Sequence, residues 1–175
     1  TFVTEVKPSA VPAGKGIPSF YKKYLEVDGL YIVSSDKVRD EALEKAYEIV
    51  SLMLAKRPDV KQYMVSKGCH VMIIGEHEEV CDLPEYAHIC NTPENIAFWN
   101  KRARGFGGAP EDDFSASCGE ENVLAFPGDK YVGENILIHE FAHLFHTIGI
   151  VGVEPDFDDR LEQCRQNAIA KGLWK

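Results

Sequence analysis

The chain is organised around residues 135–149, which read Asn-Ile-Leu-Ile-His-Glu-Phe-Ala-His-Leu-Phe-His-Thr-Ile-Gly. This segment contains His139-Glu140-Phe141-Ala142-His143, an H-E-x-x-H motif. On an α-helix, residues four positions apart lie on one face, about 6 Å apart along the axis, so both imidazoles can reach one metal ion. Zn2+ held by His139 and His143 would lower the pKa of a water molecule and polarise a substrate carbonyl, while Glu140 takes the proton.

The same segment predicts a helix that is largely buried. Its apolar residues form a wide surface made of Ile136, Leu137, Ile138, Phe141, Ala142, Leu144, Phe145 and Ile148. We expect the helix to end at Gly149, because glycine commonly follows the last helical turn. The alternative to a metal site is that His139, Glu140 and His143 are structural side chains bonded only to backbone. It is disfavoured because burying three such groups without partners costs on the order of kilocalories each.

Residues 133–149 resemble the active-site helix of zincin metallopeptidases, and the form His-Glu-Phe-Ala-His is similar to that of secreted, lethal-factor-like members. A metzincin would require glycine at 146 and histidine at 149, whereas this chain has His146 and Gly149. Further segments resemble a group of secreted zincin-like proteins: Arg102-Ala-Arg-Gly-Phe-Gly-Gly, Ser117-Cys-Gly-Glu-Glu-Asn and Ala170-Lys-Gly-Leu-Trp. The resemblance covers about Ser19 to Trp174 and implies an α+β, zincin-like fold with a long N-terminal helix, a small mixed sheet, the H-E-x-x-H helix and a C-terminal helix.

Length and composition indicate a single domain. The chain has 175 residues, 45% of them hydrophobic, which is enough for one core. Residues 1–19 carry three prolines and two glycines without periodicity, so they are expected to form an extended arm before a domain at 20–175. The net charge of −9 argues against nucleic acid and anionic membranes as partners. No apolar run approaches about 18 residues, so no membrane insertion is predicted.

The five cysteines, which lack any C-x-x-C pair, favour disulfides over a thiolate metal site. Scattered cysteines in a protease-like chain favour an oxidising compartment, and we therefore expect secretion; reduced cytosolic thiols are the alternative. The sequence leaves the pairing open. Cys81 with Cys90 would close a compact loop, and Cys69 with Cys118 would tie a strand to a later segment.

The N-terminal half predicts a hairpin, two helices and a strand. Residues 24–27 and 30–33 flank Asp28-Gly29, which favours a tight hairpin turn. Apolar residues at helical spacing predict a helix from about Val38 to Lys56, capped by Ser35 or Asp36. A shorter helix is expected to begin at Pro58, pass through Tyr63 and Met64 and end before Gly68, followed by a buried strand over residues 69–75.

Residues 76–121 show little periodicity and are expected to form ordered loops around a cleft. Four aromatic residues there could pack or line substrate pockets, and packing is favoured: Phe98, Trp99, Phe106 and Phe114. Residues 122–126 read as a strand closed by Pro127-Gly128. By analogy with zincins, this strand or one in the preceding loop is the candidate for binding an extended peptide.

The C-terminal segment is expected to supply the third metal ligand. Residues 158–171 predict a helix with Leu161, Cys164, Ala168 and Ile169 facing inward. Glu162 is the preferred ligand because it lies 19 residues after His143, close to the spacing of gluzincin-like sites. Glu154 or Asp156 is the next choice, and a solvated acidic helix start is the competing interpretation of Glu162.

The remaining histidines are not expected to bind the metal. His146 continues the stripe of His139 and His143, but a further turn of the same helix does not readily reach their metal, so a supporting or structural role is favoured. His70 is expected to be a satisfied core or edge residue, and His77 and His88 are expected to be solvated.

Together these patterns predict a secreted zinc-dependent metallopeptidase that hydrolyses peptide bonds in a peptide or protein substrate, with Glu140 as general base. The alternative is a non-catalytic secreted binding or structural protein that keeps the fold, with or without metal. After His143 only 32 residues remain, and among them His146 is the one Tyr or His that could stabilise an oxyanion. A chain shortened at its C-terminus would also explain this shortage.

Overall fold

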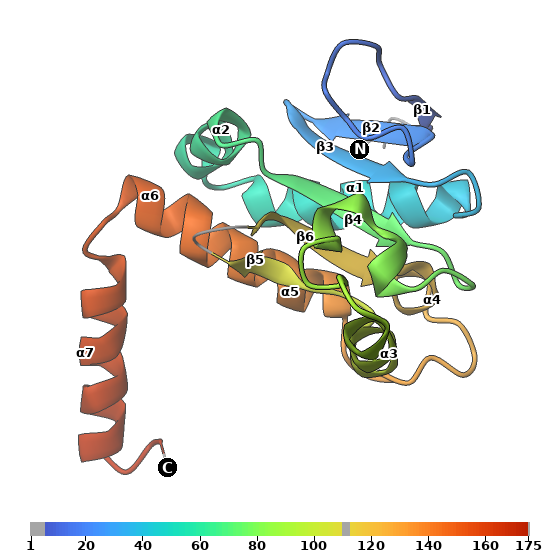
Figure 1. Cartoon of the computed structure of the whole chain (residues 1–175). Coiled ribbons are helices and arrows are strands. Elements are labelled where there is room, and N and C mark those ends of the chain that lie inside the picture. Colours follow the sequence, from blue (N-terminus) through green and yellow to red (C-terminus); the bar gives the residue numbers. More distant parts are fainter. Residues whose placement is uncertain (1–5, 110–112, 175) are drawn as a thin grey trace.

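The computed structural model describes residues 6–109 and 113–174 and has an α+β fold built on one mixed sheet (Figure 1). The strands lie in the order β1-β2-β3-β4-β6-β5. Their bounds are β1 Ser9–Ala10, β2 Lys23–Val27, β3 Leu30–Ser34, β4 His70–Ile74, β5 Gly107–Ala109 and β6 Asp113–Gly119. The central strands β3, β4 and β6 are parallel, and β1, β2 and β5 pair antiparallel with their neighbours. The predicted small mixed sheet is confirmed.

The hairpin of β2 and β3 turns at Asp28 and Gly29 as predicted. Their φ angles are 48° and 101°, and a two-residue turn with two positive φ angles matches the twist of the flanking strands. At its outer edge, β1 pairs with β2, so part of the N-terminal arm belongs to the sheet.

The two predicted N-terminal helices are α1, Asp40–Leu54, and α2, Pro58–Ser66. The predicted cap of α1 at Ser35 or Asp36 is wrong. The N-cap is Arg39, which has no side-chain cap, and its backbone N–H instead donates to Glu120 Oε2 at 2.9 Å. A carboxylate distant in sequence therefore bonds the backbone at the helix start, which a local pattern does not reveal.

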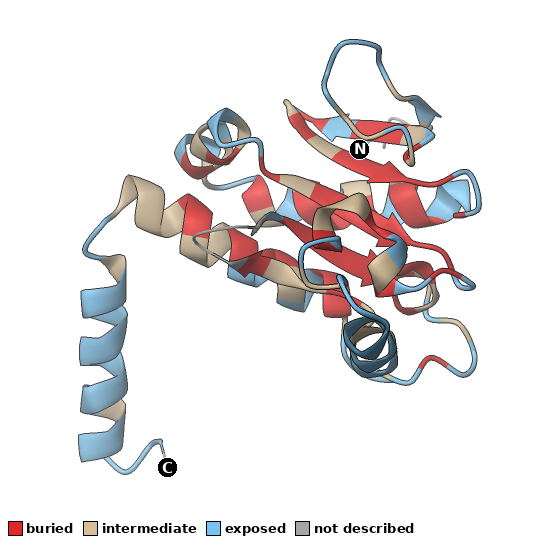
Figure 2. Ribbon diagram, in the orientation of Figure 1, coloured by how far each residue is buried: buried red, intermediate tan, exposed pale blue. Residues whose placement is uncertain are grey.

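The central strands bury both of their faces (Figure 2). On one face, Val71 and Ile73 of β4 join a core with apolar residues of α1, α2 and the H-E-x-x-H helix. On the other, Met72 and Ile74 join a smaller core with Leu83 and other residues of the segment after β4. Because successive side chains of a strand point to opposite faces, a continuous apolar run is what a sheet covered on both sides requires.

The segment 76–121 is more regular than predicted. It contains two short 3-10 helices, η1 Val80–Asp82 and η2 Pro84–Tyr86, then α3 Pro93–Arg102 and the strands β5 and β6. The loop prediction failed at α3 because that helix buries no residue, so it shows no apolar stripe. Trp99 and Phe106 pack edge to face with ring centroids 5.3 Å apart, as the packing interpretation expected.

One disulfide joins Cys81 and Cys90, with Cα atoms 5.6 Å apart, and closes the compact loop considered above. The other pairing considered, Cys69 with Cys118, is not present: both are buried thiols, and Cys164 is an exposed thiol.

The predicted strand over residues 122–126 is wrong. Glu120–Val123 form a short helix, α4, that follows β6 directly. Asn122 is the reason that this segment turns inward: it is buried and its side chain bonds three groups of the following loop and helix. A residue with such long-range hydrogen bonds overrides a weak local strand preference.

The H-E-x-x-H helix is α5, Ile136–Leu144, and it does not end at Gly149. It continues through a π-helical turn, η3 Phe145–Ile150, into α6 Val151–Val153. Gly149 serves packing instead, because a Cβ there would lie 2.6 Å from the Val60 side chain. By length and composition, residues 136–153 are long and apolar enough to cross a membrane, whereas the sequence analysis found no apolar run of about 18 residues. The core helix of a protein passes the same test, and this helix packs on the sheet.

The C-terminal helix α7, Phe157–Ala170, is confirmed as a helix, but its predicted inward face is wrong. It extends away from the body of the molecule in Figure 1 and buries none of its residues. Leu161, Cys164 and Ile169 are exposed, and Ala168 is half-buried. The apolar residues do share a stripe, as their spacing predicted, but the stripe stays largely exposed, with Trp174 beside it.

Candidate metal centre

Two asparagine side chains fix the start of α5. Asn135 Oδ1 accepts a hydrogen bond from the Ile138 N–H at 2.9 Å, and Asn122 Oδ1 accepts one from the Ile136 N–H at 2.7 Å. Both donors belong to the first turn, which has no intrahelical acceptors. The helix is therefore anchored one turn before His139.

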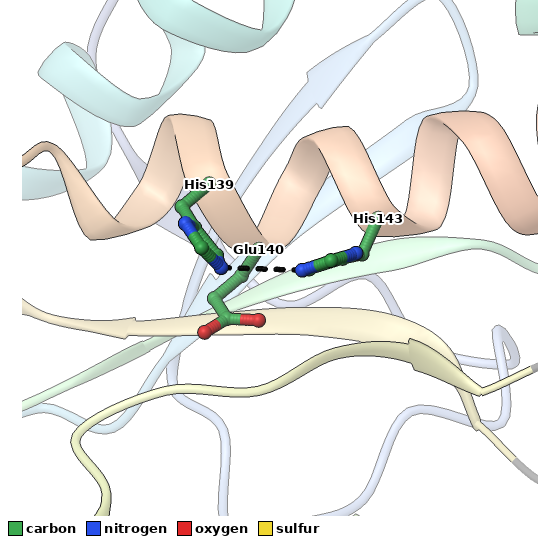
Figure 3. A group of neighbouring side chains, drawn as sticks. All are labelled: His139, Glu140 and His143. Carbon is green, nitrogen blue, oxygen red and sulfur yellow. Dashed lines mark hydrogen bonds between the residues drawn. The ribbon is translucent and has the colours of Figure 1, made fainter. Parts of the chain in front are cut away.

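His139 and His143 project from the same side of α5, as predicted, with Glu140 beside them (Figure 3). Their Nε2 atoms lie 3.2 Å apart, and the ligand atoms of all three residues lie within 4.8 Å of one another. Two nitrogens bound tetrahedrally to Zn2+ at about 2.0–2.1 Å are separated by about 3.3 Å. Among the His, Cys, Asp and Glu side chains of residues 6–109 and 113–174, these three form the group whose spacing suits a metal ion.

The burial of these side chains differs from the expectation. Ile136, Leu137, Phe141 and Leu144 bury one face of α5, whereas both histidines are exposed and Glu140 is half-buried. Burial raises the pKa of Glu140; the charge of His139 opposes this and that of Glu134 adds to it. A carboxylate with a raised pKa is a better proton acceptor near neutral pH.

A cleft of about 420 Å³ opens beside His139 and Glu140. Arg102, Phe106 and Tyr131 are among the residues that line it. The Tyr131 hydroxyl donates to the Arg102 carbonyl at 3.3 Å. The cleft thus brings Tyr131 and Arg102 into one lining with His139 and Glu140.

The edge strand β5 lies directly against α5. A Cβ on Gly107 would lie 2.1 Å from the Glu140 carbonyl oxygen, and a Cβ on Gly108 would lie 2.8 Å from Leu144 Cα. The Thr147 hydroxyl also donates to the Gly108 carbonyl at 3.2 Å. Two glycines therefore permit the close approach of the sheet edge to the helix.

Glu134 contacts His139 on the side of the ring away from His143. Its Oε1 lies 3.1 Å from His139 Nδ1. The two ring nitrogens of His139 thus meet different partners, a carboxylate at Nδ1 and His143 at Nε2.

The structure does not bring Glu162 to the histidine pair. Glu162 lies on the exposed helix α7 and is absent from the metal-suited group of the described residues. Hydrogen bonds from Arg165 and Gln166 lower the pKa of Glu162 to about 2. Its role as third ligand remains a prediction that this arrangement does not support.

The other acidic candidates also have partners elsewhere. Glu154 pairs with Arg57 at 2.7 Å and with Arg160, and Asp156 pairs with Arg160 at 3.2 Å. Neither joins His139 and His143 in the metal-suited group found among the described residues.

The remaining histidines lie outside this group. His146 Nε2 lies 2.6 Å from Asp158 Oδ1, which is a structural contact between η3 and α7. His70 is half-buried at the start of the central strand β4. Its ring stacks on Tyr31, its Nδ1 lies 2.9 Å from the Gly68 carbonyl and its Nε2 lies 3.4 Å from Glu85 Oε1. His77 and His88 are exposed, as predicted.

Sequence analysis missed Glu134, Tyr131 and Arg102 because it looked for supporting residues after the motif. Glu134 precedes His139 by only five residues, so its closeness to the helix start was a usable signal. Arg102 and Tyr131 had no such signal, because the cleft brings them together from two separate segments.

Comparison of the chain with family models, with curated proteins and with solved structures finds no match in any of the three.

Proposed function

We propose that this protein is a secreted zinc-dependent metallopeptidase of zincin type. The observation that carries the proposal is the 3.2 Å separation of the two Nε2 atoms beside a half-buried glutamate. His139 and His143 would hold Zn2+, which supplies Lewis-acid activation of water and of a peptide carbonyl. Glu140 accepts the proton from the attacking water and passes it to the leaving amine.

The cleft and the sheet edge support a peptide as substrate. β5 is an edge strand beside α5, and an edge strand can pair with an extended peptide through backbone hydrogen bonds. The Tyr131 hydroxyl in the cleft is a candidate donor to a developing oxyanion. The disulfide Cys81–Cys90 supports an oxidising compartment, and the net charge of −9 disfavours nucleic acid as partner.

A second candidate, a non-catalytic metal-binding protein with this fold, is favoured by one observation. In the described part of the chain, the metal-suited group contains two histidines and the general base, and no further carboxylate. A catalytic zinc site ordinarily has three protein ligands, so a site with two would bind zinc weakly and hydrolyse little.

Metal analysis combined with two variants separates these possibilities. The wild type is expected to take up about one Zn2+ per chain, and the double variant His139→Ala/His143→Ala is expected to take up none. Glu140→Gln should keep the metal and lose peptide cleavage, measured by mass spectrometry on a peptide library. No uptake by the wild type contradicts both candidates in their metal-bound form.

Cleavage results then decide between them. Metal uptake without cleavage by the wild type supports the non-catalytic candidate. Equal cleavage by the wild type and Glu140→Gln would assign the activity to a contaminant.

A further inference from the structure

The contact between Glu134 and His139 bears on which ring nitrogen can bind a metal. Glu134 Oε1 lies 3.1 Å from Nδ1, and an ionised carboxylate can only accept a hydrogen bond. In a neutral imidazole one nitrogen carries the proton and the other carries a lone pair. Glu134 lies at ion-pair distance from Nδ1 without the alignment of a hydrogen bond. Its negative charge there favours the proton on Nδ1 and leaves the lone pair on Nε2, the nitrogen that faces His143.

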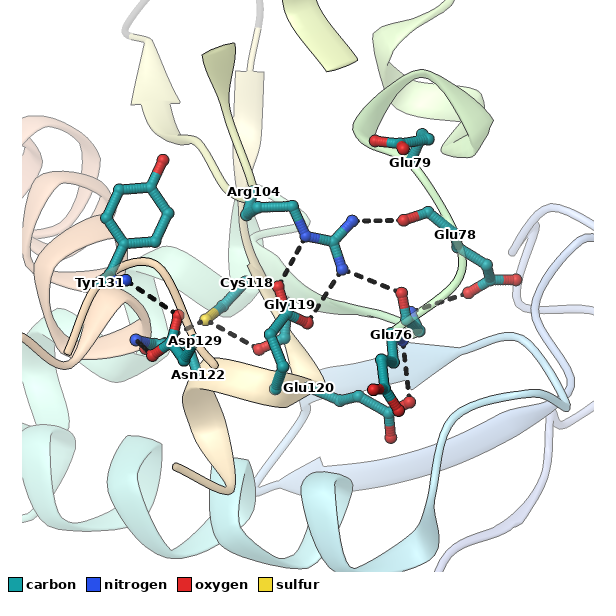
Figure 4. A network of polar contacts seen from close by, with 12 residues as sticks. Glu76, Glu78, Glu79, Arg104, Cys118, Gly119, Glu120, Asn122, Asp129 and Tyr131 are labelled. Carbon is teal, nitrogen blue, oxygen red and sulfur yellow. Dashed lines mark hydrogen bonds and ion pairs between the residues drawn. The ribbon is translucent and has the colours of Figure 1, made fainter. Parts of the chain in front are cut away.

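The loop that carries Glu134 is held on a buried support (Figure 4). Asn122 Nδ2 donates to the Glu134 carbonyl at 2.9 Å and to Asp129 Oδ2 at 2.7 Å. Asp129 Oδ1 in turn accepts from the Tyr131 N–H at 3.0 Å. Through its Oδ1, Asn122 also bonds the Ile136 N–H, so one side chain fixes the backbone on both sides of Asn135.

This support fixes the backbone of Glu134. The Glu134 N–H donates to the Tyr131 carbonyl at 3.0 Å, which closes the turn before the helix. Gly133 in this turn has a φ of 90°, a conformation that other residues rarely adopt. The Glu134 backbone is thus set relative to α5 from two directions, and its side chain needs to order only a few torsions to reach His139.

We propose that Glu134 is a positioning residue that holds His139 with Nε2 free to bind the metal. The inference rests on the metal site of the proposed function. Carboxylates that accept from the second nitrogen of a ligating histidine typically contribute 10–100-fold to metal affinity. The competing explanation is an ordinary surface ion pair, since both side chains are about half exposed, and such pairs contribute little to stability.

Three variants separate these explanations. Glu134→Ala removes the acceptor, and Glu134→Gln keeps an acceptor but removes the charge. Glu48→Ala is the matched control, because Glu48 forms a comparable exposed ion pair with Lys45 at 2.7 Å on α1. The dissociation constant for Zn2+ is measured by competition with a chromophoric chelator, and folding is checked by thermal unfolding without metal.

Glu134→Ala is expected to weaken Zn2+ binding about 10–100-fold, and Glu134→Gln less, with unchanged unfolding midpoints. Glu48→Ala should bind as the wild type does. Equal affinities for Glu134→Ala and the wild type would overturn the positioning role alone, whereas no binding by the wild type would also contradict the proposed function.

A second measurement does not depend on metal. Nitrogen-15 NMR of the metal-free protein, under conditions where the ring is neutral, reports which nitrogen of His139 carries the proton. We expect Nδ1–H in the wild type, a smaller preference for it in Glu134→Gln, and a shift toward Nε2–H in Glu134→Ala. The same tautomer in all three proteins would show that Glu134 does not set the ring, whatever the metal affinity.

Discussion

Glu85 illustrates how single residues in this fold depend on partners from distant segments. It lies in η2, and its carboxylate accepts from Tyr21 and faces His70 at the start of β4. Burial alone would raise the pKa of Glu85, but the bonds to His70 and Tyr21 outweigh burial and lower it from 4.5. Three segments far apart in the sequence thus determine the ionisation of one carboxyl group.

The pKa shift of Glu85 predicts acid sensitivity of the fold. Because the folded state binds this proton less tightly than the unfolded state, the contribution to stability is present above about pH 4.5 and is lost as the pH falls through the lowered pKa. The free energy of unfolding of Glu85→Gln should therefore fall less steeply on acidification than that of the wild type. Urea unfolding at a series of acidic pH values checks this, with the exposed Glu94→Gln as control; parallel curves would contradict the assignment.

At the scale of elements, the packing of β5 on α5 joins the sheet edge to the candidate site. Gly107 faces the backbone of Glu140, so the strand and the helix touch without an intervening side chain. Neither element alone predicts this contact. A glycine pair in a strand indicates a close approach but not the partner.

Gly107→Ala should therefore damage both stability and the site. The added methyl group would lie 2.1 Å from the Glu140 carbonyl oxygen, so backbone must move. Overpacking of this kind costs about 1–3 kcal/mol of unfolding free energy, and the displaced turn should weaken Zn2+ binding. Chemical unfolding and chelator competition measure the two effects. Gly108→Ala, whose nearest contact is 2.8 Å, should be milder, and unchanged metal affinity in both variants would contradict the coupling.

At the scale of the whole molecule, α7 stands apart from the domain core. It buries none of its residues, and its links to the body include the contact of Asp158 with His146 and that of Arg160 with Glu154. Local pairs such as Glu162 with Arg165 help to keep it helical. The body should therefore fold without it.

Ending the chain after Asp156 should shift the thermal unfolding midpoint by less than about 3 °C, because it removes ion pairs and the packing of the half-buried Phe157 on His146 but no fully buried residue. Zn2+ affinity should stay unchanged, since Glu162 does not approach the histidines. Differential scanning calorimetry and chelator competition provide the measurements. Loss of Zn2+ binding both on truncation and in Glu162→Ala would instead place the third ligand on α7.

The amino-acid sequence by itself determined the features that follow from local periodicity and turn chemistry. The Asp28-Gly29 hairpin, the helices after Arg39 and Pro58, the buried strand over residues 70–74 and the pairing of His139 with His143 on one helix face all have such signals. In each case neighbouring residues carry enough information, because backbone geometry fixes which side chains share a face.

Tertiary structure decided what depends on partners distant in sequence. Asn122 holds the residues after β6 in place of the expected strand, Glu120 bonds the backbone at the start of α1, and Gly149 packs against Val60 inside a helix that continues past it. The exposure of α7 belongs to the same class. The physical reason is that hydrogen bonds and van der Waals contacts act over a few ångströms in space, and chain folding alone decides which residues come within that distance.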